Sequence, residues 1–270
     1  MSKVFNLKYP QFTDSYVRRL KTVKSDNALL FVGLPGVGFA SKLAVDHLVR
    51  QLKAEKVATV YSPHFPNQVI ATAKGGLRAF CLKFYYKKVN GKSVYFLKGD
   101  LQPLTVEGQY EVTSKSLQFF KEMGGVKVYA MAGLVTQAQK ERSIHVSSTH
   151  QKELKHLKKT LGVKINSNYV PIVGMAGLIP TLAPLFDLTG SCMLVETTGE
   201  AIDPIAAGKL VEMFGKMVGK KVPVDDLNKR AKRAKDNLEK LSRQPMPQEP
   251  TAAMPGTAPA MPKETLSYIR

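Results

Sequence analysis

The chain has 270 residues and a formal net charge of +19, because 40 lysine and arginine residues stand against 21 aspartate and glutamate residues. Its hydrophobic content of 44% is that of an ordinary globular protein, and the roughly 240 residues before a proline-rich end suffice for one large domain. The first residues lack an apolar stretch with a cleavage site, and prolines interrupt the longest uncharged run, 165–186. Neither a secretory signal nor a membrane span is therefore expected.

The first third of the chain alternates strand and helix signals. Residues 28–32 form a short apolar run of the kind found in buried parallel strands, and a glycine turn, 33–38, follows it. Apolar residues then recur at helical spacing, which predicts a helix with one buried stripe. The stripe consists of Ala40, Leu43, Ala44, His47, Leu48 and Leu52. Further strands are predicted at 56–61 and 68–73.

A β-hairpin is predicted around Asn90-Gly91, which separates the strand candidates 80–89 and 92–97. It adds an antiparallel pair to an otherwise parallel sheet. A helix at 106–123 and a strand at 126–131 follow. The polar stretch 135–149 is expected to be an exposed loop that leads into a lysine-rich helix ending near Thr160.

The second half continues with strand candidates at 169–173 and 192–196, separated by a short helix that follows 174–178. Asp203 and Pro204 have the residue types of an N-cap and a first helical position, which predicts a helix to about Val218. A last helix begins near Asp225, and its apolar residues have the spacing of a helix–helix seam, on the body or on a neighbouring subunit. These residues are Leu227, Ala231, Ala234, Leu238 and Leu241. The pattern predicts a three-layer α/β domain over residues 1–241.

The cysteines and the basic residues point to no special chemistry. Cys81 and Cys192 lie far apart in apolar runs, so we expect buried thiols in a reduced, cytoplasmic protein. The lysines are scattered, and aromatic residues are not interleaved with them as in RNA-binding modules. The densest basic cluster falls on the last predicted helix and is typical of a solvated helix face. We therefore expect no nucleic-acid partner, while an acidic protein would suit the surface.

The glycine turn resembles two phosphate-binding motifs in part. Gly33 and Gly38 have the spacing of a P-loop, but Phe39 stands where a lysine must reach the phosphates. Gly36 and Gly38 begin a dinucleotide fingerprint whose third glycine position holds Ser41. A tight strand-to-helix turn explains the same residues.

Candidate catalytic and metal-binding residues are few. His47 lies on the apolar helix stripe and is expected in the core, and His145, His150 and His156 lack metal-ligand spacing. Neither a Gly-x-Ser-x-Gly elbow nor a general acid/base pair occurs. Glu196 and Glu200 follow a predicted strand, where α/β sheets place ligands, although helix capping and loop solvation explain them equally. We expect no cofactor and no metal.

Residues 242–270 have a different composition from the rest. The segment is rich in proline and shows no apolar periodicity, so it cannot bury enough surface to offset its ordering entropy and is expected to be disordered. It nevertheless ends in large apolar residues beside a terminal carboxylate, Tyr268-Ile269-Arg270. Capture of a C-terminal carboxylate is a recurring recognition mode, so we expect this end to enter a pocket of a partner.

Several short motifs, in consistent order from residue 28 to residue 241, resemble the archaeal proteasome-assembly-chaperone family. They are 30–39 (LFVGLPGVGF), 62–66 (SPHFP), 99–102 (GDLQ), 129–133 (YAMAG), 174–178 (GMAGL), 194–197 (LVET) and 203–207 (DPIAA). The resemblance implies a nucleoside-phosphorylase-like fold with a mixed, mostly parallel sheet and without phosphorylase activity. It also implies a homo-oligomer that binds the α-subunits of the proteasome core particle, as an assembly chaperone or as a gate-opening activator.

The resemblance also gives the C-terminus a receptor. Proteasome activators end in a hydrophobic residue, a tyrosine and any residue, which insert between α-subunits. Here Tyr268 takes the hydrophobic position, Ile269 stands where the tyrosine is expected, and Arg270 is terminal. The departure at Ile269 affects gate opening more than docking, because isoleucine still fills an apolar pocket.

Three hypotheses follow, of which the first is preferred. The first is a non-enzymatic, oligomeric protein that docks its C-terminal tails into the proteasome α-ring. The alternative is a small-molecule binding protein or enzyme, with a nucleoside or phosphate-type ligand near 33–38 and Glu196. The third is a basic scaffold whose nucleic-acid binding would depend steeply on salt.

Overall fold

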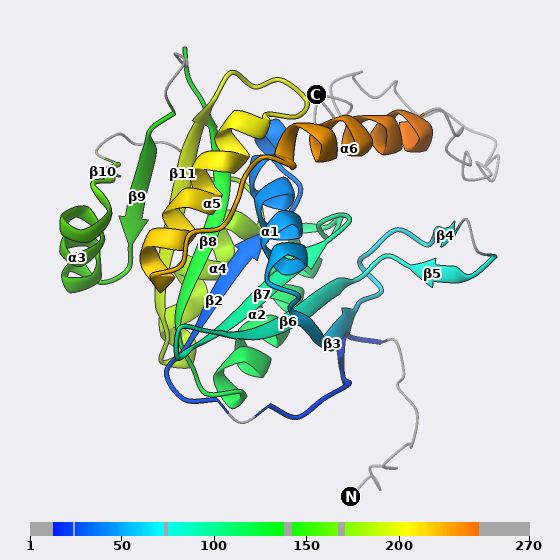
Figure 1. Cartoon of the computed structure of the whole chain (residues 1–270). Coiled ribbons are helices and arrows are strands. Elements are labelled where there is room, and N and C mark those ends of the chain that lie inside the picture. The colour runs from blue at the N-terminus through cyan, green and yellow to red at the C-terminus, as the bar shows by residue number, and fades with distance from the viewer. Residues whose placement is uncertain (1–12, 24, 73–74, 138–141, 167–170, 243–270) are drawn as a thin grey trace, which may run out of the picture.

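The computed structural model describes residues 13–23, 25–72, 75–137, 142–166 and 171–242 (Figure 1). Strands and helices alternate along most of the chain. The strands are β1 (Tyr16–Arg19), β2 (Ala28–Gly33), β3 (Glu55–Tyr61), β4 (Val69–Ala71), β5 (Leu77–Ala79), β6 (Leu82–Val89), β7 (Lys92–Gly99), β8 (Gly125–Val135), β9 (Ile144–Ser148), β10 (Lys164–Ile165) and β11 (Thr189–Thr197). The α-helices are α1 (Ala40–Gln51), α2 (Val106–Glu122), α3 (Gln151–Leu161), α4 (Met175–Leu182), α5 (Pro204–Val218) and α6 (Leu227–Ser242), with the short 3-10 turns Val37–Phe39 and Ala183–Phe186.

One mixed sheet forms the middle layer, in the order β1-β3-β6-β7-β2-β8-β11-β9-β10. Its centre, β7-β2-β8-β11, is parallel, and these strands read as nearly continuous apolar runs because helices cover both of their faces. The flanking pairs β1–β3, β3–β6, β6–β7 and β9–β11 are antiparallel. Asn90 and Gly91 both have positive φ, as a tight hairpin turn requires, and they reverse the chain between β6 and β7.

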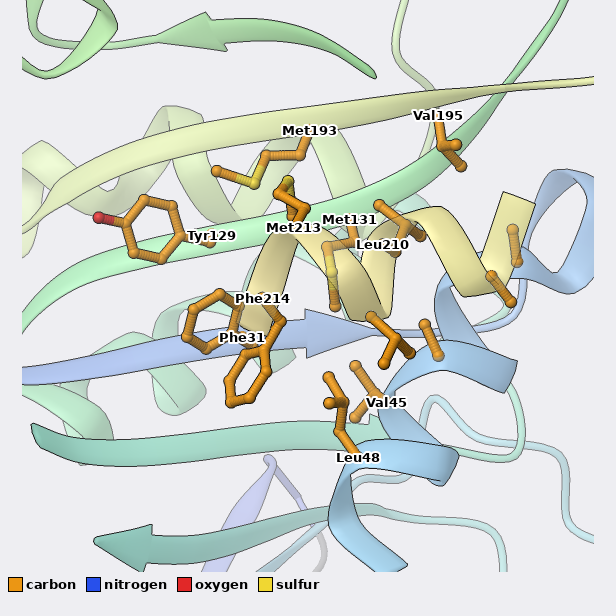
Figure 2. Packing of buried hydrophobic residues seen from close by; sticks show 14 of the residues in the cluster. Phe31, Val45, Leu48, Tyr129, Met131, Met193, Val195, Leu210, Met213 and Phe214 are labelled. Atoms are coloured by element: carbon orange, nitrogen blue, oxygen red, sulfur yellow. The ribbon is translucent and has the colours of Figure 1, made fainter. Parts of the chain in front are cut away.

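Helices on the two faces of the sheet enclose two hydrophobic clusters, which confirms the three-layer α/β architecture. α1 and α5 pack together on one face, and α2 and α4 pack on the other (Figure 1). On the first face, the Phe31 ring of β2 lies 5.2 Å from the Tyr129 ring of β8 and 4.8 Å from the Phe214 ring of α5, centroid to centroid. Met131, Met193 and Leu210 fill the space around these rings (Figure 2).

Asp203 anchors α5 as predicted. Its Oδ1 accepts the backbone N–H of Ala206 at 2.9 Å, and its Oδ2 accepts from the Thr197 hydroxyl at 2.8 Å and from the Arg142 guanidinium at 3.1 Å. Its own N–H donates to the Gly38 carbonyl at 2.7 Å. The Asp203 and Arg142 side chains are only 4% and 7% exposed. The carboxylate therefore joins the start of α5 to the end of β11 and to Arg142, and the backbone N–H of the same residue holds the glycine turn.

The described side chains of α6 that are buried, Leu227 and Ala231, lie in its first two turns. Leu227 and Ala231 are buried against α1 and α5, whereas the lysines of the opposite face are exposed. Figure 1 shows the helix leaving the body beside the N-terminal part of α5. The predicted seam is confirmed for Leu227 and Ala231, while the side chains of Leu238 and Leu241 lie outside the description.

Two predicted segments differ from the structure. The stretch 135–149 is not all loop: β9 occupies Ile144–Ser148 and pairs with β11, with Ile144 and Val146 buried. Its short run alternates apolar and polar residues, so the polar composition concealed a half-buried strand. The strand predicted at 169–173 is wrong for 171–173, which has no regular structure, and 169–170 lie outside the described residues.

Other predictions for single residues are confirmed. Cys81 and Cys192 are buried free thiols, and burial raises the pKa of Cys192 to about 12, so this thiol stays protonated. His47 is fully buried, its Nε2 lies 2.6 Å from the Pro223 carbonyl, and burial lowers its pKa. Every helix within the described ranges is too short or too polar to span a membrane.

We predict that Asp203→Ala lowers the free energy of unfolding by about 3–5 kcal/mol, because it leaves a buried guanidinium without its carboxylate and removes an N-cap. Asp203→Asn keeps the cap and should cost less. Glu200→Ala removes an exposed carboxylate three residues earlier and should change stability little. Urea denaturation measures all three, and equal stabilities for Asp203→Ala and Glu200→Ala would contradict the anchoring role.

Candidate protein-interaction face

The carboxyl ends of the four parallel strands meet at one edge of the sheet, where α/β proteins place ligands. The glycine turn after β2, the segment after β7, the end of β8 and the start of α5 all lie there. The residues of the sequence-predicted small-molecule site, 33–38 and Glu196, are brought to this edge as well. What these groups contact decides what the edge can do.

The glycine turn is packed against its neighbours and leaves no cradle for a phosphate beneath it. Gly38 has φ of 63°, and a Cβ there would lie 2.7 Å from Thr197 Oγ1. A Cβ at Gly133 of β8 would overlap the carbonyl of Val37. The glycines are thus explained by close packing of the turn on β8 and β11, together with the positive φ of Gly38.

Lys42, the first lysine after the turn, is buried and occupied. It pairs with Asp46 one helical turn later, and Lys98 at the end of β7 donates to the other carboxylate oxygen of Asp46 at 2.5 Å. Burial by itself raises the pKa of Asp46, but the charges and hydrogen bonds of Lys42 and Lys98 outweigh it and hold the pKa below its ordinary value. Asp46 therefore links Lys42 of α1 to Lys98 of β7, and Lys42 has a structural role.

Glu196 is likewise satisfied by its own chain. Its Oε2 accepts the Ser143 backbone N–H at 2.9 Å, and its Oε1 lies 2.8 Å from His145 Nε2. Burial raises its pKa, yet the hydrogen bonds from His145 and Ser143 and the charge of Lys164 lower it overall. The carboxylate joins β11 to the start of β9, and Glu200, which is exposed, lies in the following loop.

A third cluster has the order hydroxyl, imidazole and carboxylate that nucleophilic sites use. Thr105 Oγ1 lies 3.0 Å from His64 Nδ1, and His64 Nε2 lies 3.1 Å from Glu111 Oε2. The Thr105 oxygen also accepts the Gly108 N–H at 3.0 Å as the N-cap of α2, and a second oxygen of Glu111 accepts the Ser15 N–H. The cluster thus joins β1 and the segment after β3 to α2, and sequence reasoning missed it because its members are far apart in the chain.

Exposed apolar side chains, rather than free polar groups, characterise this edge. Leu77 is 75% exposed and Leu104 is 70% exposed. Most of the exposed large apolar residues of the described chain lie at or beside the edge, namely Val37, Val69, Leu77, Leu104, Val106, Tyr110, Val135, Val173 and Ile205. Large exposed apolar patches are typical of protein-interaction surfaces, so this edge is a candidate for one. Sequence reasoning missed it because these residues read as core.

A cavity of about 440 Å³ lies at the opposite edge, beside the starts of β2, β7 and β8. Two of its lysines have structural partners: Lys92 Nζ donates to the Met217 carbonyl at 2.6 Å, and Lys127 Nζ donates to Glu153 at 2.5 Å. Lys92 caps the C-terminal end of α5, and Lys127 pairs with the buried carboxylate of Glu153. These two lysines therefore have structural roles that explain their position in the cavity. Among the described residues, no His, Cys, Asp and Glu side chains are grouped so as to hold a metal ion.

The predicted anchor residues Tyr268, Ile269 and Arg270 lie outside the described residues, as does the whole segment 243–270. The last described residue, Ser242, is the end of α6 (Figure 1).

We predict that Asp46→Asn destabilises the protein by about 1–3 kcal/mol near pH 6, because two lysines lose their charged partner. The pKa of Asp46 is lower in the folded than in the unfolded chain, so the pair stabilises the fold above the unfolded value, about 4, and this contribution disappears as the pH falls through the folded value. Denaturation at pH 6 and pH 3 should therefore show a smaller difference between variant and parent at pH 3.

Glu55→Gln is the matched control, because Glu55 pairs with Lys21 on the surface, with both side chains more than half exposed. It should change stability little at either pH. If the effect of Asp46→Asn were the same at pH 6 and pH 3, its cause would be packing rather than charge.

Comparison with known proteins gives a consistent picture. The PAC2 family matches residues 30–242. An uncharacterized protein of Methanocaldococcus jannaschii is 32% identical over 227 residues, which cover 84% of this chain and 88% of that protein.

Two crystal structures from Pyrococcus furiosus are similar over nearly their whole length. PbaB, described as an archaeal proteasome activator, is 27% identical with a TM-score of 0.75, covering 85% of this chain and 99% of that chain. PbaA, described as an archaeal homolog of proteasome-assembly chaperone, is 27% identical with a TM-score of 0.70, covering 84% of this chain and 96% of that chain. These matches confirm the resemblance inferred from the motifs: the chain belongs to the PAC2 family.

Proposed function

We propose that this protein is a non-enzymatic partner of the proteasome core particle in the cytoplasm, an assembly chaperone or an activator. In this proposal it forms a homo-oligomer and docks its C-terminal tails into pockets between the α-subunits. The observation that carries the proposal is the similarity to PbaB, an archaeal proteasome activator, over 85% of this chain.

The closed carboxyl edge supports a binding role over a catalytic one. Asp46, Glu196, Asp203 and the His64–Glu111 pair all have partners within the chain. An active site of this fold would need at least one such group turned toward a substrate. The apolar side chains that are exposed there instead suit contact with protein.

The position of α6 supports docking by a tail. The helix of 16 residues rises about 24 Å, and its first two turns pack on the body through Leu227 and Ala231. Whatever follows Ser242 therefore starts at a distance from the domain. The remaining residues would span roughly 30 Å as a coil and up to ~90 Å as polyproline II, which is enough to reach a pocket on a neighbouring particle.

The anchor chemistry is that of a weak, multivalent ligand. Tyr268 and Ile269 supply apolar surface, and the carboxylate of Arg270 can pair with a lysine of the receptor. A three-residue anchor binds weakly alone, but several tails on one oligomer raise the avidity by about 10²–10⁴ where the geometry allows.

We predict that deleting residues 267–270 lowers the amount of core particle retained in a pull-down by about tenfold or more, because every tail of the oligomer loses its anchor. Circular dichroism should show an unchanged fold. Deleting 251–254 shortens the tail equally but keeps the anchor, so this variant should retain the core particle. Equal retention by the two deletions would contradict tail docking.

We further predict that Ile269→Tyr tightens docking by about 2–10-fold, the worth of one added hydrogen bond, and raises peptidase activity of the bound core particle. The substitution restores the tyrosine that activator tails carry at this position. Ile269→Phe adds the same ring without the hydroxyl and is the matched control. Equal peptidase activity with Phe and Tyr would show that the hydroxyl is not the missing element.

A further inference from the structure

The cavity of about 440 Å³ at the amino ends of the parallel strands lies between α3 and the C-terminal end of α5 (Figure 1). The starts of β2, β7 and β8 line it from the side of the sheet. Small-molecule sites occupy about 300–1,000 Å³ and combine a mostly apolar lining with a few polar groups. This cavity has the size of such a site.

Part of its lining is apolar and incompletely covered. On β2, the side chain of Leu29 is half-buried, whereas its neighbours Ala28 and Leu30 are fully buried. Leu161 at the end of α3 and Met217 near the end of α5 pack against the same core cluster as Leu29, and they too are only partly buried. A ligand with an apolar body would cover these three side chains, Leu29, Leu161 and Met217, which we call the apolar wall.

Three lysines, Lys92, Lys127 and Lys216, line the same cavity. Lys92 donates to the Met217 carbonyl, and Lys127 donates to the Glu153 carboxylate. An ammonium group has three N–H donors, so each of these bonds holds a lysine in place and leaves two donors for a ligand. Lys216 forms no hydrogen bond or ion pair with any residue that the structure describes, so all three of its donors remain for water or a ligand.

The charge of the lining favours an anion. Glu153 compensates Lys127, but neither Lys92 nor Lys216 has a carboxylate partner within the described part of the chain. α3 adds further lysines, and Glu153 is its one carboxylate, so the potential around the cavity attracts anions. A phosphate monoester carries a charge of about −1.5 to −2 at pH 7 and three acceptor oxygens, which matches two uncompensated lysines and a third donor.

We propose that this cavity binds a phosphate monoester with an apolar body, such as a phosphorylated aromatic alcohol. The phosphate group lies among the three lysines, and the body lies against the apolar wall. The site is separate from the glycine turn, whose partial phosphate motif lies at the other edge of the sheet. It is also independent of the proposed docking by the tail, because every residue that forms it belongs to the domain.

The first test is calorimetric titration of the full chain at low salt with three probes: phenyl phosphate, inorganic phosphate and benzoate. Inorganic phosphate lacks the apolar body, and benzoate has the ring with a single negative charge. Phenyl phosphate should bind about tenfold or more tightly than either, because burial of a ring and pairing of a second charge are each worth about that factor.

The second test removes one lysine. Lys216→Gln should weaken phenyl phosphate binding about tenfold without changing the thermal stability of the free protein, because Lys216 has no partner among the described residues. Lys209→Gln is the matched control: it removes the same charge from an exposed position on the same helix, about two turns earlier and outside the cavity lining. Its affinity should equal that of the parent chain.

Four results would each overturn the inference. The first is no binding of phenyl phosphate at about 10 mM, where even weak sites fill. The second is an equal loss of affinity in Lys216→Gln and Lys209→Gln, which would indicate general attraction to a basic protein. The others are inorganic phosphate or benzoate binding as tightly as phenyl phosphate, which would exclude the apolar wall or the doubly charged head group, respectively.

Discussion

The buried carboxylate of Asp203 is the contact on which the functional edge of this molecule depends. It begins α5, accepts from Thr197 at the end of β11 and from Arg142, and its N–H fixes the Gly38 carbonyl. The side chain of Asp203 joins α5 to β11 and Arg142, and its backbone N–H holds the glycine turn, which packs onto β8 and β11. The space in which a related α/β protein would hold a ligand is filled by the protein itself. The result is a closely packed edge at the carboxyl ends of the parallel strands.

The charge of that edge and its exposed apolar side chains are related. The chain as a whole is strongly basic, yet the exposed Leu104, Val106 and Tyr110 lie in a segment, 100–111, whose charged residues are all acidic. Repulsion between like charges disfavours contact with other basic surfaces over most of the molecule. Burial of apolar side chains stabilises a contact only where the charge is low. A protein built in this way associates through a few defined surfaces. The described lysines of α6 are exposed and add to the positive charge of the surface.

The sequence predicted the layers and most elements because buried strands and amphipathic helices have clear periods. The 28–32 run, the Asn90-Gly91 hairpin and the Asp203 cap each form where expected. β9 was missed because a short strand with alternating polar residues resembles a loop. The interaction face was missed for a different reason: Leu77, Leu104 and Val173 look like core residues in sequence, and only tertiary placement leaves them exposed. Paired groups such as His64 and Glu111 are equally invisible, because 47 positions separate them.

In the proposed function, assembly and docking are coupled. An anchor of three residues at the end of a long tether binds too weakly to hold a large particle alone, so the number of tails on one body sets the avidity. That number is fixed by contacts between bodies, far from the anchor in the sequence. Under the same proposal, an imperfect anchor such as Ile269 would be tolerated, since several weak contacts made together compensate for one missing hydroxyl.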